Sequence, residues 1–414
     1  MKVLLVTANF HPEKTGISVT ATDCAKFISE LGNQVTVICG MPYYPEWKIR
    51  DGYRGKLFTT EMFHGITLRR VWLYVPSKPT SLRRIVHEVS FSALAFLRSV
   101  ALRYDLVLCI SPPLTSALAA TLIGLVRSKK VWSYVQDIQP DTAVELGMLR
   151  NRKLIRLLQL VEKFIYQRSE KILTLSEGMA ENIAAKGVPR SKLKVVPFSI
   201  DVKEIRRTDR QSSSFRQKNG LDSKFLVLYS GNLGVKHNPT IIVDCANILA
   251  SHSNIFFAVV GEGAMKEAVQ RRIEEYQLTN VRVFPLCERD ELGDMLSSAD
   301  VLVVSQRKEV VDIVLPSKLL AYFASGRSVV VCANPQSEAA KILRENKLGM
   351  VVPPDDPQAL AEAILYLRAH SQEAEENGRR GYDYVLSNFD EDVVKAAYYK
   401  PLFSNRDASI KLHP

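Results

Sequence analysis

The sequence predicts two α/β domains in series, each a doubly wound, Rossmann-like parallel sheet with helices on both faces. Short β-branched apolar runs alternate with helical stretches along most of the 414 residues. The same alternation restarts after a polar stretch near the middle of the chain. The length suits two domains of about 200 residues each, and 46% hydrophobic against 24% charged residues is typical of a folded globular protein.

The first domain is predicted to open with a strand at 3–6, a polar loop containing Pro12 and Gly16, and a helix at about 19–31. Its further strands are expected at 34–39, 66–71, 106–110, 131–135 and 172–175. A polar stretch at 201–220, rich in Arg, Ser, Lys and Gln, then indicates an interdomain linker.

The second domain repeats the pattern. Its strands are expected at 225–229, 255–260, 281–284, 301–304 and 328–332, and its helices at about 240–250, 265–276, from 317, and 357–367. The domains are therefore predicted as 1–200 and 201–382, with a C-terminal helix of about 383–414 packing back on the first. Such sheets bind ligands at the carboxyl ends of their strands, so we expect the active site in the cleft between the domains.

Charge is distributed unevenly along the chain. The net charge is +11, and residues 1–200 hold 28 Lys and Arg against 15 Asp and Glu. A polyanionic partner of the first domain, either nucleic acid or an anionic membrane surface, would explain this excess; a merely solubilising surface is the alternative. The sequence contains no recognisable nucleic-acid recognition motif.

The six cysteines are far apart and form no C-x-x-C pair, so the sequence predicts reduced thiols in the cytoplasm rather than a zinc site or disulfides. The N-terminal apolar run is too short for a signal peptide. No apolar stretch reaches the length of a membrane span.

Several cofactor motifs are missing or weak. The loop after the first strand lacks the G-x-G-x-x-G of dinucleotide enzymes, and there is no Walker A motif. The isolated Gly261-Glu262-Gly263 requires only a tight turn. Asp390-Glu391-Asp392 matches a short metal-binding pattern of some sugar transferases, but we interpret it as the acidic start of a helix.

Two segments of the second domain favour phosphate binding. The first, SGNLGVKH at 230–237, follows a strand and combines two glycines with a lysine. The second, LPSKLL at 315–320, precedes a helix with Pro and Ser at its start. Backbone amides at a helix N-terminus beside a lysine suit a diphosphate; an ordinary loop is the alternative for each segment alone.

These segments carry a family resemblance. The chain resembles the retaining family 4 glycosyltransferases of GT-B fold, and among them the bacterial colanic-acid and O-antigen fucosyl or N-acetylfucosaminyl transferases. The matching segments are VLLVTANFHPEKTG (3–16), YVQDIQP (134–140), LTLSEGMAENI (173–183), YSGNLGVKHNP (229–239), PSKLLAYFASGRSVVV (316–331) and VVPPDDPQALAEAI (351–364).

The resemblance implies that the second domain holds a nucleotide sugar, most often a UDP-sugar, while the first holds the acceptor. Carried over by position, the residues at the diphosphate are Asn232, Lys236, Ser317, Lys318 and Leu319. Gly16 would face the donor from the first domain, and Asp137 would line the cleft near the reacting carbon, unless it is only a turn or cap residue. Gln136 replaces a histidine that relatives often have there. His11 and His237 are further candidates.

One departure concerns two glutamates, eight positions apart, that many relatives have. Here Ile313 and Ala321 stand at those positions. The second glutamate holds the ribose or the sugar in relatives, and the sequence does not choose among possible substitutes. These substitutes are Glu309, Asp312 and Glu338.

The implied reaction breaks a bond from sugar carbon to diphosphate oxygen, and charge grows on the leaving phosphate. Lys236 and Lys318 with a helix N-terminus can stabilise that charge without a metal. The family is thought to react on one face of the sugar, with the leaving phosphate helping to deprotonate the acceptor. A sugar-nucleotide epimerase of the same architecture and a catalytically impaired UDP-binding protein are the alternatives.

A membrane-facing helix is also predicted in the first domain. From Leu82 onward, apolar residues recur at helical spacing beside a basic edge formed by Arg83, Arg84 and His87. Packing on the sheet is the alternative for this stripe. Acceptors of the resembled enzymes are usually lipid-linked, so the sequence predicts peripheral docking on the cytoplasmic face of the plasma membrane, with Arg83 and Arg84 in contact.

Overall fold

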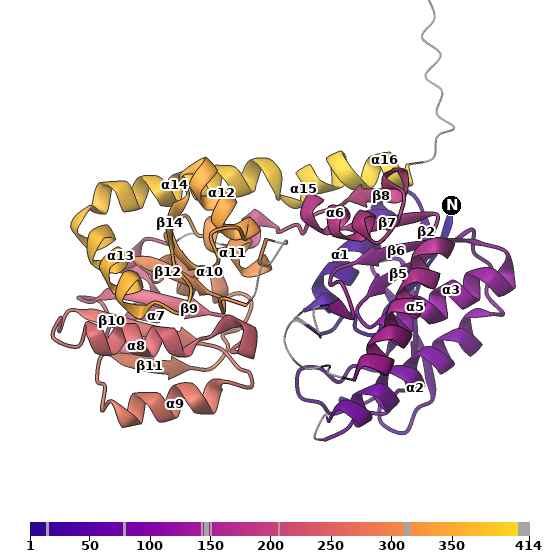
Figure 1. Cartoon of the computed structure of the whole chain (residues 1–414), viewed down its shortest axis with the longest axis horizontal. Coiled ribbons are helices and arrows are strands. Elements are labelled where there is room, and N and C mark those ends of the chain that lie inside the picture. Colours follow the sequence, from indigo (N-terminus) through magenta and orange to yellow (C-terminus); the bar gives the residue numbers. More distant parts are fainter. Residues whose placement is uncertain are drawn as a thin grey trace, which may run out of the picture. The chain divides into compact units, whose positions relative to one another are not determined.

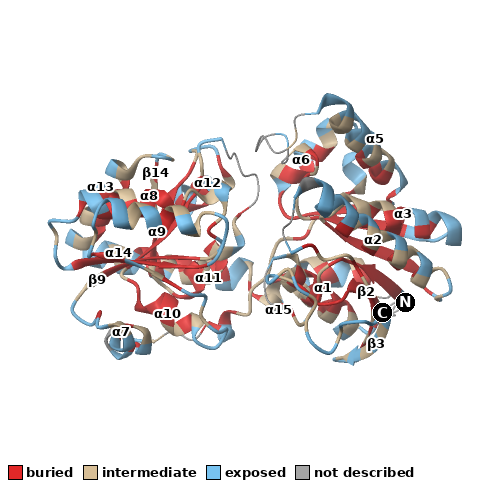
Figure 2. Cartoon of the chain, turned by 90° about the horizontal axis from the view of Figure 1, so that it is seen from below, coloured by how far each residue is buried: buried red, intermediate tan, exposed pale blue. Residues whose placement is uncertain are grey.

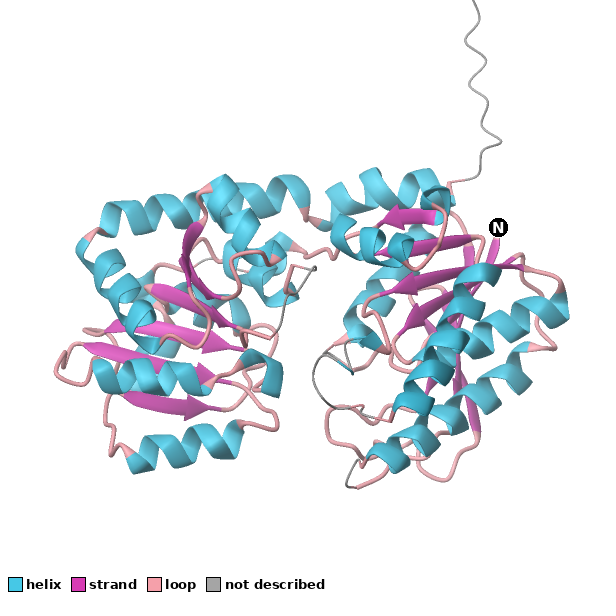
Figure 3. Cartoon of the chain, in the orientation of Figure 1, coloured by secondary structure: helices cyan, strands magenta, loops and turns pink. Residues whose placement is uncertain are grey.

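A computed structural model describes residues 1–13, 16–77, 80–141, 144, 149, 151–205, 208–309 and 315–404. The chain divides into two compact units. Unit 1 comprises 1–197 and the returning segment from 394, and unit 2 comprises 198–393. Both units are α/β (Figure 1, Figure 3).

Unit 1 contains an eight-stranded sheet in the order β3-β4-β2-β1-β5-β6-β7-β8. All neighbouring strands are parallel except β3 and β4. The strands are β1 Lys2–Val6, β2 Gln34–Gly40, β3 Phe58–Phe63, β4 Ile66–Val71, β5 Leu106–Ser111, β6 Lys130–Val135, β7 Lys171–Thr174 and β8 Leu193–Val195. The expected strands are present, and the two edge strands β3 and β8 are additional.

The helices of unit 1 are α1 Ile17–Glu30, α2 Ser81–Ser99, α3 Leu114–Arg127, α5 Arg152–Arg168 and α6 Glu177–Ala185. α1 covers one face of the sheet, while α2 and α3 cover the other (Figure 2). The returning segment, α15 Glu391–Val394, the π-helix η5 Lys395–Tyr399 and α16 Lys400–Phe403, packs on unit 1, where Tyr399 contacts the ring of Phe27. Asp390 accepts the amide of Asp392 at 3.1 Å, as expected for the acidic start of a helix.

Unit 2 has a six-stranded parallel sheet in the order β11-β10-β9-β12-β13-β14. Its strands are β9 Phe225–Ser230, β10 Ile255–Val260, β11 Val281–Phe284, β12 Val301–Ser305, β13 Ser328–Cys332 and β14 Gly349–Val352. Its helices are α7 Ser214–Asn219, α8 Thr240–Ile248, α9 Lys266–Glu275, α10 Leu292–Ser298, α11 Ser317–Ala324, α12 Glu338–Asn346, α13 Pro357–Ala369 and α14 Ser371–Asn388.

Alternate strand residues of unit 2 face two apolar clusters. Leu228 of β9 belongs to the cluster with α10, α11 and α14, and Val227 to the cluster with α8 and α13. The central strands are therefore buried on both faces, as is usual in parallel sheets (Figure 2).

The prediction of a linker at 201–220 is wrong. Arg216 is buried and pairs with Asp300 at 2.6 Å, and Asp294 accepts hydrogen bonds from Ser213 and Ser214. Two aspartates of unit 2 thus hold a polar segment whose composition alone is typical of a linker.

Candidate functional site

A glycine-rich loop at 231–237, here called the glycine loop, follows β9 at the carboxyl edge of the unit 2 sheet. The chain turns at Gly231 with a φ of +133°, a conformation that favours glycine. The hydroxyl of Tyr229 donates to the carbonyl of Asn232 at 3.0 Å, and Tyr322 accepts the amide of Ser230 at 2.7 Å. Two buried tyrosines thereby fix the course of the loop.

Two glycines after β10 support the glycine loop from the side. A Cβ on Gly261 would lie 2.0 Å from the carbonyl oxygen of Gly231, and one on Gly263 would lie 2.6 Å from that of Leu233. The amide of Leu233 donates to the carbonyl of Glu262 at 2.8 Å. The G-x-G segment, for which the sequence required only a tight turn, is therefore where two backbones meet.

Lys318 brings a charge to the start of the glycine loop. Its Nζ donates to the hydroxyl of Tyr229 at 2.9 Å and lies 4.2 Å from the centre of that ring. A Cβ on Gly231 would be 3.2 Å from the same Nζ, so glycine leaves room for it. Burial lowers the pKa of Lys318 to about 7.

Lys236 and His237 form the far end of the glycine loop, in a short 3-10 turn. The amide of Arg307 donates to the carbonyl of Lys236 at 3.0 Å. The hydroxyl of Ser305 donates to the carbonyl of His237 at 2.5 Å. Burial, and then the charges of Lys318 and Lys236, lower the pKa of His237 to about 3. Its Nδ1 is buried and has no hydrogen-bond partner. This neutral imidazole is thus close to both lysines.

The first turn of α11 supplies amides beside Lys318. The N-cap residue is Pro316, which offers no side-chain oxygen to the amides that follow. Leu319 is fully buried, and its amide donates to the carbonyl of Pro316 at 2.9 Å. The amides of Ser317 and Lys318, which no carbonyl of the helix itself can reach, are consequently the better anion donors.

The carboxylate candidates are scattered. Ala321 packs against the core from α11, and Glu309 is exposed after β12. Glu338 begins α12, following Ser337 as N-cap. Asp312 and Ile313 lie outside the described residues.

In unit 1, the loop after β1 ends at Gly16, the N-cap of α1, with a φ of +63°. His11 stacks on Phe63 with ring centroids 4.1 Å apart, and Arg70 donates to its carbonyl at 2.6 Å. Burial and the Arg70 charge lower the pKa of His11. Arg70 is itself buried and pairs with Glu61 at 3.0 Å. The β3–β4 hairpin therefore fixes the loop that carries His11.

Glu13 is a buried carboxylate that the sequence analysis did not single out. Its Oε1 accepts the amides of Tyr43 and Tyr44, both at 2.9 Å, and its Oε2 accepts the side-chain amide of Asn9 at 2.8 Å. Burial raises its pKa. It ties the loop after β1 to the loop after β2, and no pattern in the sequence marks it.

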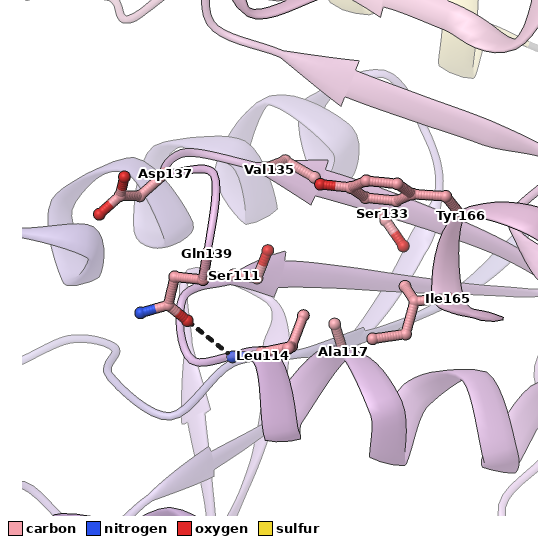
Figure 4. A pocket seen from close by; sticks show the side chains of 9 residues that line it. All are labelled: Ser111, Leu114, Ala117, Ser133, Val135, Asp137, Gln139, Ile165 and Tyr166. Carbon is pink, nitrogen blue, oxygen red and sulfur yellow. Dashed lines mark hydrogen bonds between the residues drawn. The ribbon is translucent and has the colours of Figure 1, made fainter. Parts of the chain in front are cut away.

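Asp137 follows β6 and borders a small hollow with a volume of about 10 Å³, enough for one water (Figure 4). Its carboxylate turns away from Ser133, Ile165 and Tyr166, which line the same hollow. The side-chain nitrogen of the neighbouring Gln136 is buried without a hydrogen-bond partner. A buried donor of this kind suits a ligand.

The loop of Asp137 is held by polar contacts on both sides. Gln139 accepts the amide of Leu114 at 3.0 Å (Figure 4). Asp141 pairs with Lys186 at 2.7 Å, and Lys186 also pairs with the buried Glu162 at 2.8 Å. These contacts give Asp137 a defined position.

The structure thus brings Asn232, Lys236, His237, Ser317 and Lys318 to one edge of unit 2. It places His11, Gly16 and Asp137 on loops at the carboxyl ends of strands in unit 1. Among the described residues, no three His, Cys, Asp or Glu side chains gather in a way that could hold a metal ion.

Known proteins resemble this chain over most of its length. The putative colanic acid biosynthesis glycosyl transferase WcaI of Escherichia coli is 29% identical over 409 residues, which are 95% of this chain and 100% of the relative. The probable glycosyltransferase WbjE of Pseudomonas aeruginosa is 26% identical over 277 residues, which are 65% and 69% of the two chains.

Solved structures share the fold. The Anabaena protein HepE in complex with UDP and glucose has a TM-score of 0.73 at 14% identity, with 98% of this chain and 100% of that chain covered. Sucrose-phosphate synthase from Thermosynechococcus elongatus has a TM-score of 0.74 at 16% identity, with 97% and 99% covered.

Two family models divide the chain between them. The model described as glycosyl transferase 4-like domain matches residues 15–199, and that described as glycosyl transferases group 1 matches residues 211–383. The two units are therefore those of a nucleotide-sugar-dependent enzyme, and the chain belongs to the GT-B glycosyltransferases of the family 4 type.

Proposed function

We propose that this enzyme transfers a hexosyl group from a UDP-sugar to a lipid-linked saccharide, with retention, in the assembly of a bacterial exopolysaccharide or O-antigen. The proposal that the donor is a UDP-sugar depends on one observation: Lys236, Lys318 and the first amides of α11 lie around the glycine loop. One relative, named for colanic acid biosynthesis, supports the assignment to polysaccharide assembly.

The donor diphosphate would lie along the glycine loop. Lys318 and the amides of Ser317 and Lys318 would face it from α11, and Lys236 and Asn232 would face it from the loop. Fixed positive charge of this kind stabilises the leaving phosphate as the bond to the sugar carbon breaks, and it needs no reorganisation during the reaction. EDTA is accordingly expected to leave the activity nearly intact.

The acceptor would bind unit 1. Asp137 would orient the acceptor or stabilise charge at the reacting carbon, and Gln136 would donate its buried side-chain amide to an acceptor oxygen. Gly16 would allow close approach of the loop after β1. The proton of the acceptor hydroxyl would pass to the departing phosphate, so Asp137 is not required as a nucleophile.

A thermal-shift screen tests the donor class. UDP and UDP-sugars are expected to raise the melting temperature more than GDP, ADP and their sugars, because a ligand that binds only the folded state stabilises it. A larger shift with a guanine or adenine nucleotide would overturn the choice of UDP. Because Ala321 replaces a sugar-holding glutamate of relatives, UDP binding without transfer would instead favour the impaired, UDP-binding alternative.

Replacing Gly263 by alanine is expected to weaken UDP binding at least tenfold, a cost on the scale of one lost charge-assisted hydrogen bond. The new methyl group would meet the Leu233 carbonyl at 2.6 Å and the Asn232 side-chain oxygen at 2.7 Å, and so displace the glycine loop. Gly187→Ala is the control, because its φ of +89° is similarly unfavourable but no atom lies within 4 Å of the added Cβ. Equal UDP affinity in both variants, by calorimetry, would contradict the proposed loop function.

The α2 stripe supports docking on a membrane. Leu82, Val89 and Leu97 are 72%, 50% and 65% exposed, so these residues of the stripe do not pack on the sheet. His87 corrects the predicted basic edge: it is buried, and its ring nitrogens contact the Tyr74 carbonyl and the Tyr43 hydroxyl. The basic edge is left to Arg83 and Arg84, both exposed.

Exposed apolar residues continue onto the neighbouring helices. α2 packs against α3, which packs against α5. Val126 on α3 and Leu157 and Leu160 on α5 are 61%, 56% and 65% exposed. An apolar face with basic residues beside it fits the interface of an anionic leaflet. None of the described helices is both long enough and apolar enough to cross a bilayer.

Sedimentation with vesicles containing anionic lipid tests this docking. The wild type is expected to bind at low salt and to dissociate as salt is added, since each basic side chain near the leaflet contributes about 1 kcal/mol. The double variant Arg83→Glu, Arg84→Glu should stay in the supernatant while its melting temperature is unchanged. Lys341→Glu, on the exposed side of α12 in unit 2, is the matched control. If wild-type protein remains unbound at low salt, a soluble acceptor becomes the better proposal.

A further inference from the structure

A second cavity lies in unit 1 at the amino-terminal edge of the sheet, opposite the edge where the strands end in the loops of Asp137 and His11. Its volume is about 250 Å³, some eight times the share of one water in the liquid. The walls are the first residues of β1, β2 and β4 and the connection from α2 to β5. The lining residues are Lys2, Val3, Leu4, Gln34, Thr36, Thr67, Arg69, Leu102, Arg103 and Tyr104.

The sheet face of this cavity is unusually polar. The strand registers pair Lys2 with Gln34 and Thr36 with Thr67, so these side chains and Arg69, two residues beyond Thr67 on β4, lie on one face. A parallel sheet normally presents Val, Ile and Leu to the helices that cover it. Polar side chains at these positions indicate a site that binds a polar ligand.

The charged residues that line the cavity are all positive: Lys2, Arg69 and Arg103. Asp105, which follows Tyr104 in the chain, is engaged with the backbone of Lys2. Its Oδ2 accepts the amide of Lys2 at 2.7 Å, and its own amide donates to the Lys2 carbonyl at 2.8 Å. Three cations around one cavity favour an anionic ligand.

Tyr104 provides the second observation. The residue is only 4% exposed, and its buried hydroxyl has no hydrogen-bond partner of good geometry. Burial raises the pKa of Tyr104, and the charge of Arg127 and its side-chain contact with the hydroxyl oppose the rise. A buried hydroxyl without a well-formed hydrogen bond costs free energy unless a ligand satisfies it.

We propose that this cavity binds a small organic phosphate that also carries hydroxyl groups. The phosphate would face Lys2, Arg69 and Arg103, while the hydroxyls would pair with the threonines and with Tyr104. The site lies outside the proposed donor and acceptor regions, and the proposal does not depend on the transfer activity.

Calorimetric titration with glucose 6-phosphate, inorganic phosphate and glucose tests the proposal, with saturating UDP present so that the glycine loop cannot supply the anion site. If UDP does not bind, the same titrations are made with the Lys318→Met variant, in which the glycine loop lacks the charge of Lys318. Glucose 6-phosphate is expected to bind with a Kd of about 1 mM or tighter. Inorganic phosphate should bind roughly tenfold more weakly, and glucose should not bind measurably. Equal affinity for glucose 6-phosphate and inorganic phosphate would contradict the proposal that the cavity recognises hydroxyl groups. No binding of glucose 6-phosphate would contradict the proposal that the cavity is a ligand site.

Variants locate the binding. Arg69→Gln and Arg103→Gln are each expected to weaken glucose 6-phosphate roughly tenfold, whereas Arg168→Gln, on an exposed position of α5, should not. Tyr104→Phe should weaken binding with little loss of melting temperature, because the contact with Arg127 that the variant loses is not a well-formed hydrogen bond. Arg103 is exposed, so its variant keeps the test valid if Arg69→Gln does not fold. Unchanged affinity in both arginine variants would place the ligand elsewhere.

Discussion

Replacing Lys318 by methionine is expected to abolish tight UDP binding while making the ligand-free protein more stable. The affinity loss should be tenfold to a hundredfold, because a charge-assisted contact to the diphosphate contributes about 1.5 to 3 kcal/mol. The gain in stability follows from the burial that lowers the pKa of Lys318 from 10.5 to about 7. Tyr229 keeps a partner without the lysine, since its hydroxyl donates to the carbonyl of Asn232.

The pH dependence has a definite sign. Between pH 7 and 10.5 the unfolded chain holds the Lys318 proton that the folded chain has released, so wild-type stability rises with pH across this window. The destabilisation of the wild-type protein by the buried Lys318 charge is complete below about pH 7 and disappears near pH 10.5. The methionine variant should therefore gain melting temperature chiefly at pH 6, by roughly 2 to 4 °C, and less at pH 9.

Binding should change with pH in the opposite direction. Free wild-type protein loses the Lys318 charge as pH rises through about 7, so its UDP affinity is expected to fall from pH 6 to pH 8. The Lys318→Met variant should lack this fall in UDP affinity between pH 6 and pH 8. Lys341→Met, at an exposed position of α12, is the control and should match the wild type in both measurements. A variant that binds UDP as the wild type does would show that Lys318 faces no diphosphate.

The strand positions could be predicted because parallel strands buried on both faces are continuous apolar runs, as at Ile255–Val260. The edge strand Phe58–Phe63 could not, because it is antiparallel, none of its residues is fully buried, and its pattern does not distinguish it from a loop. The segment 201–220 has a linker's composition, and contacts with distant residues, among them Asp294 and Asp300, make it part of unit 2.

Residues of the candidate site could be predicted where they belong to a short contiguous segment with a recognisable motif. The two lysines and the glycine loop belong to short segments with their own signature. Glu13 could not be found and the burial of His87 could not be predicted, since charged and polar residues are usually exposed and their burial depends on partners far along the chain. The contact of Gly261 with Gly231, thirty residues away, is likewise visible only in three dimensions.

The variant Asp137→Asn is expected to lower the transfer rate about a hundredfold, the usual cost of removing one preorganised electrostatic contact at a reacting centre. Its affinity for UDP should stay within about twofold, because UDP is proposed to bind unit 2 and Asp137 belongs to unit 1. The melting temperature should not change, because the asparagine keeps the shape of the side chain and the loop is held by other residues.

Asp141→Asn is the matched control for this variant, since Asp141 is on the same loop and pairs with Lys186 at 2.7 Å. Weakening that ion pair should lower the melting temperature and change the transfer rate far less. Kinetics at saturating donor, calorimetry with UDP and thermal melts of the two variants separate the outcomes. If Asp137→Asn instead loses transfer and UDP binding equally, or melts well below the wild type, then Asp137 is a turn residue that supports the loop, and the group that acts at the reacting carbon must be sought elsewhere in unit 1.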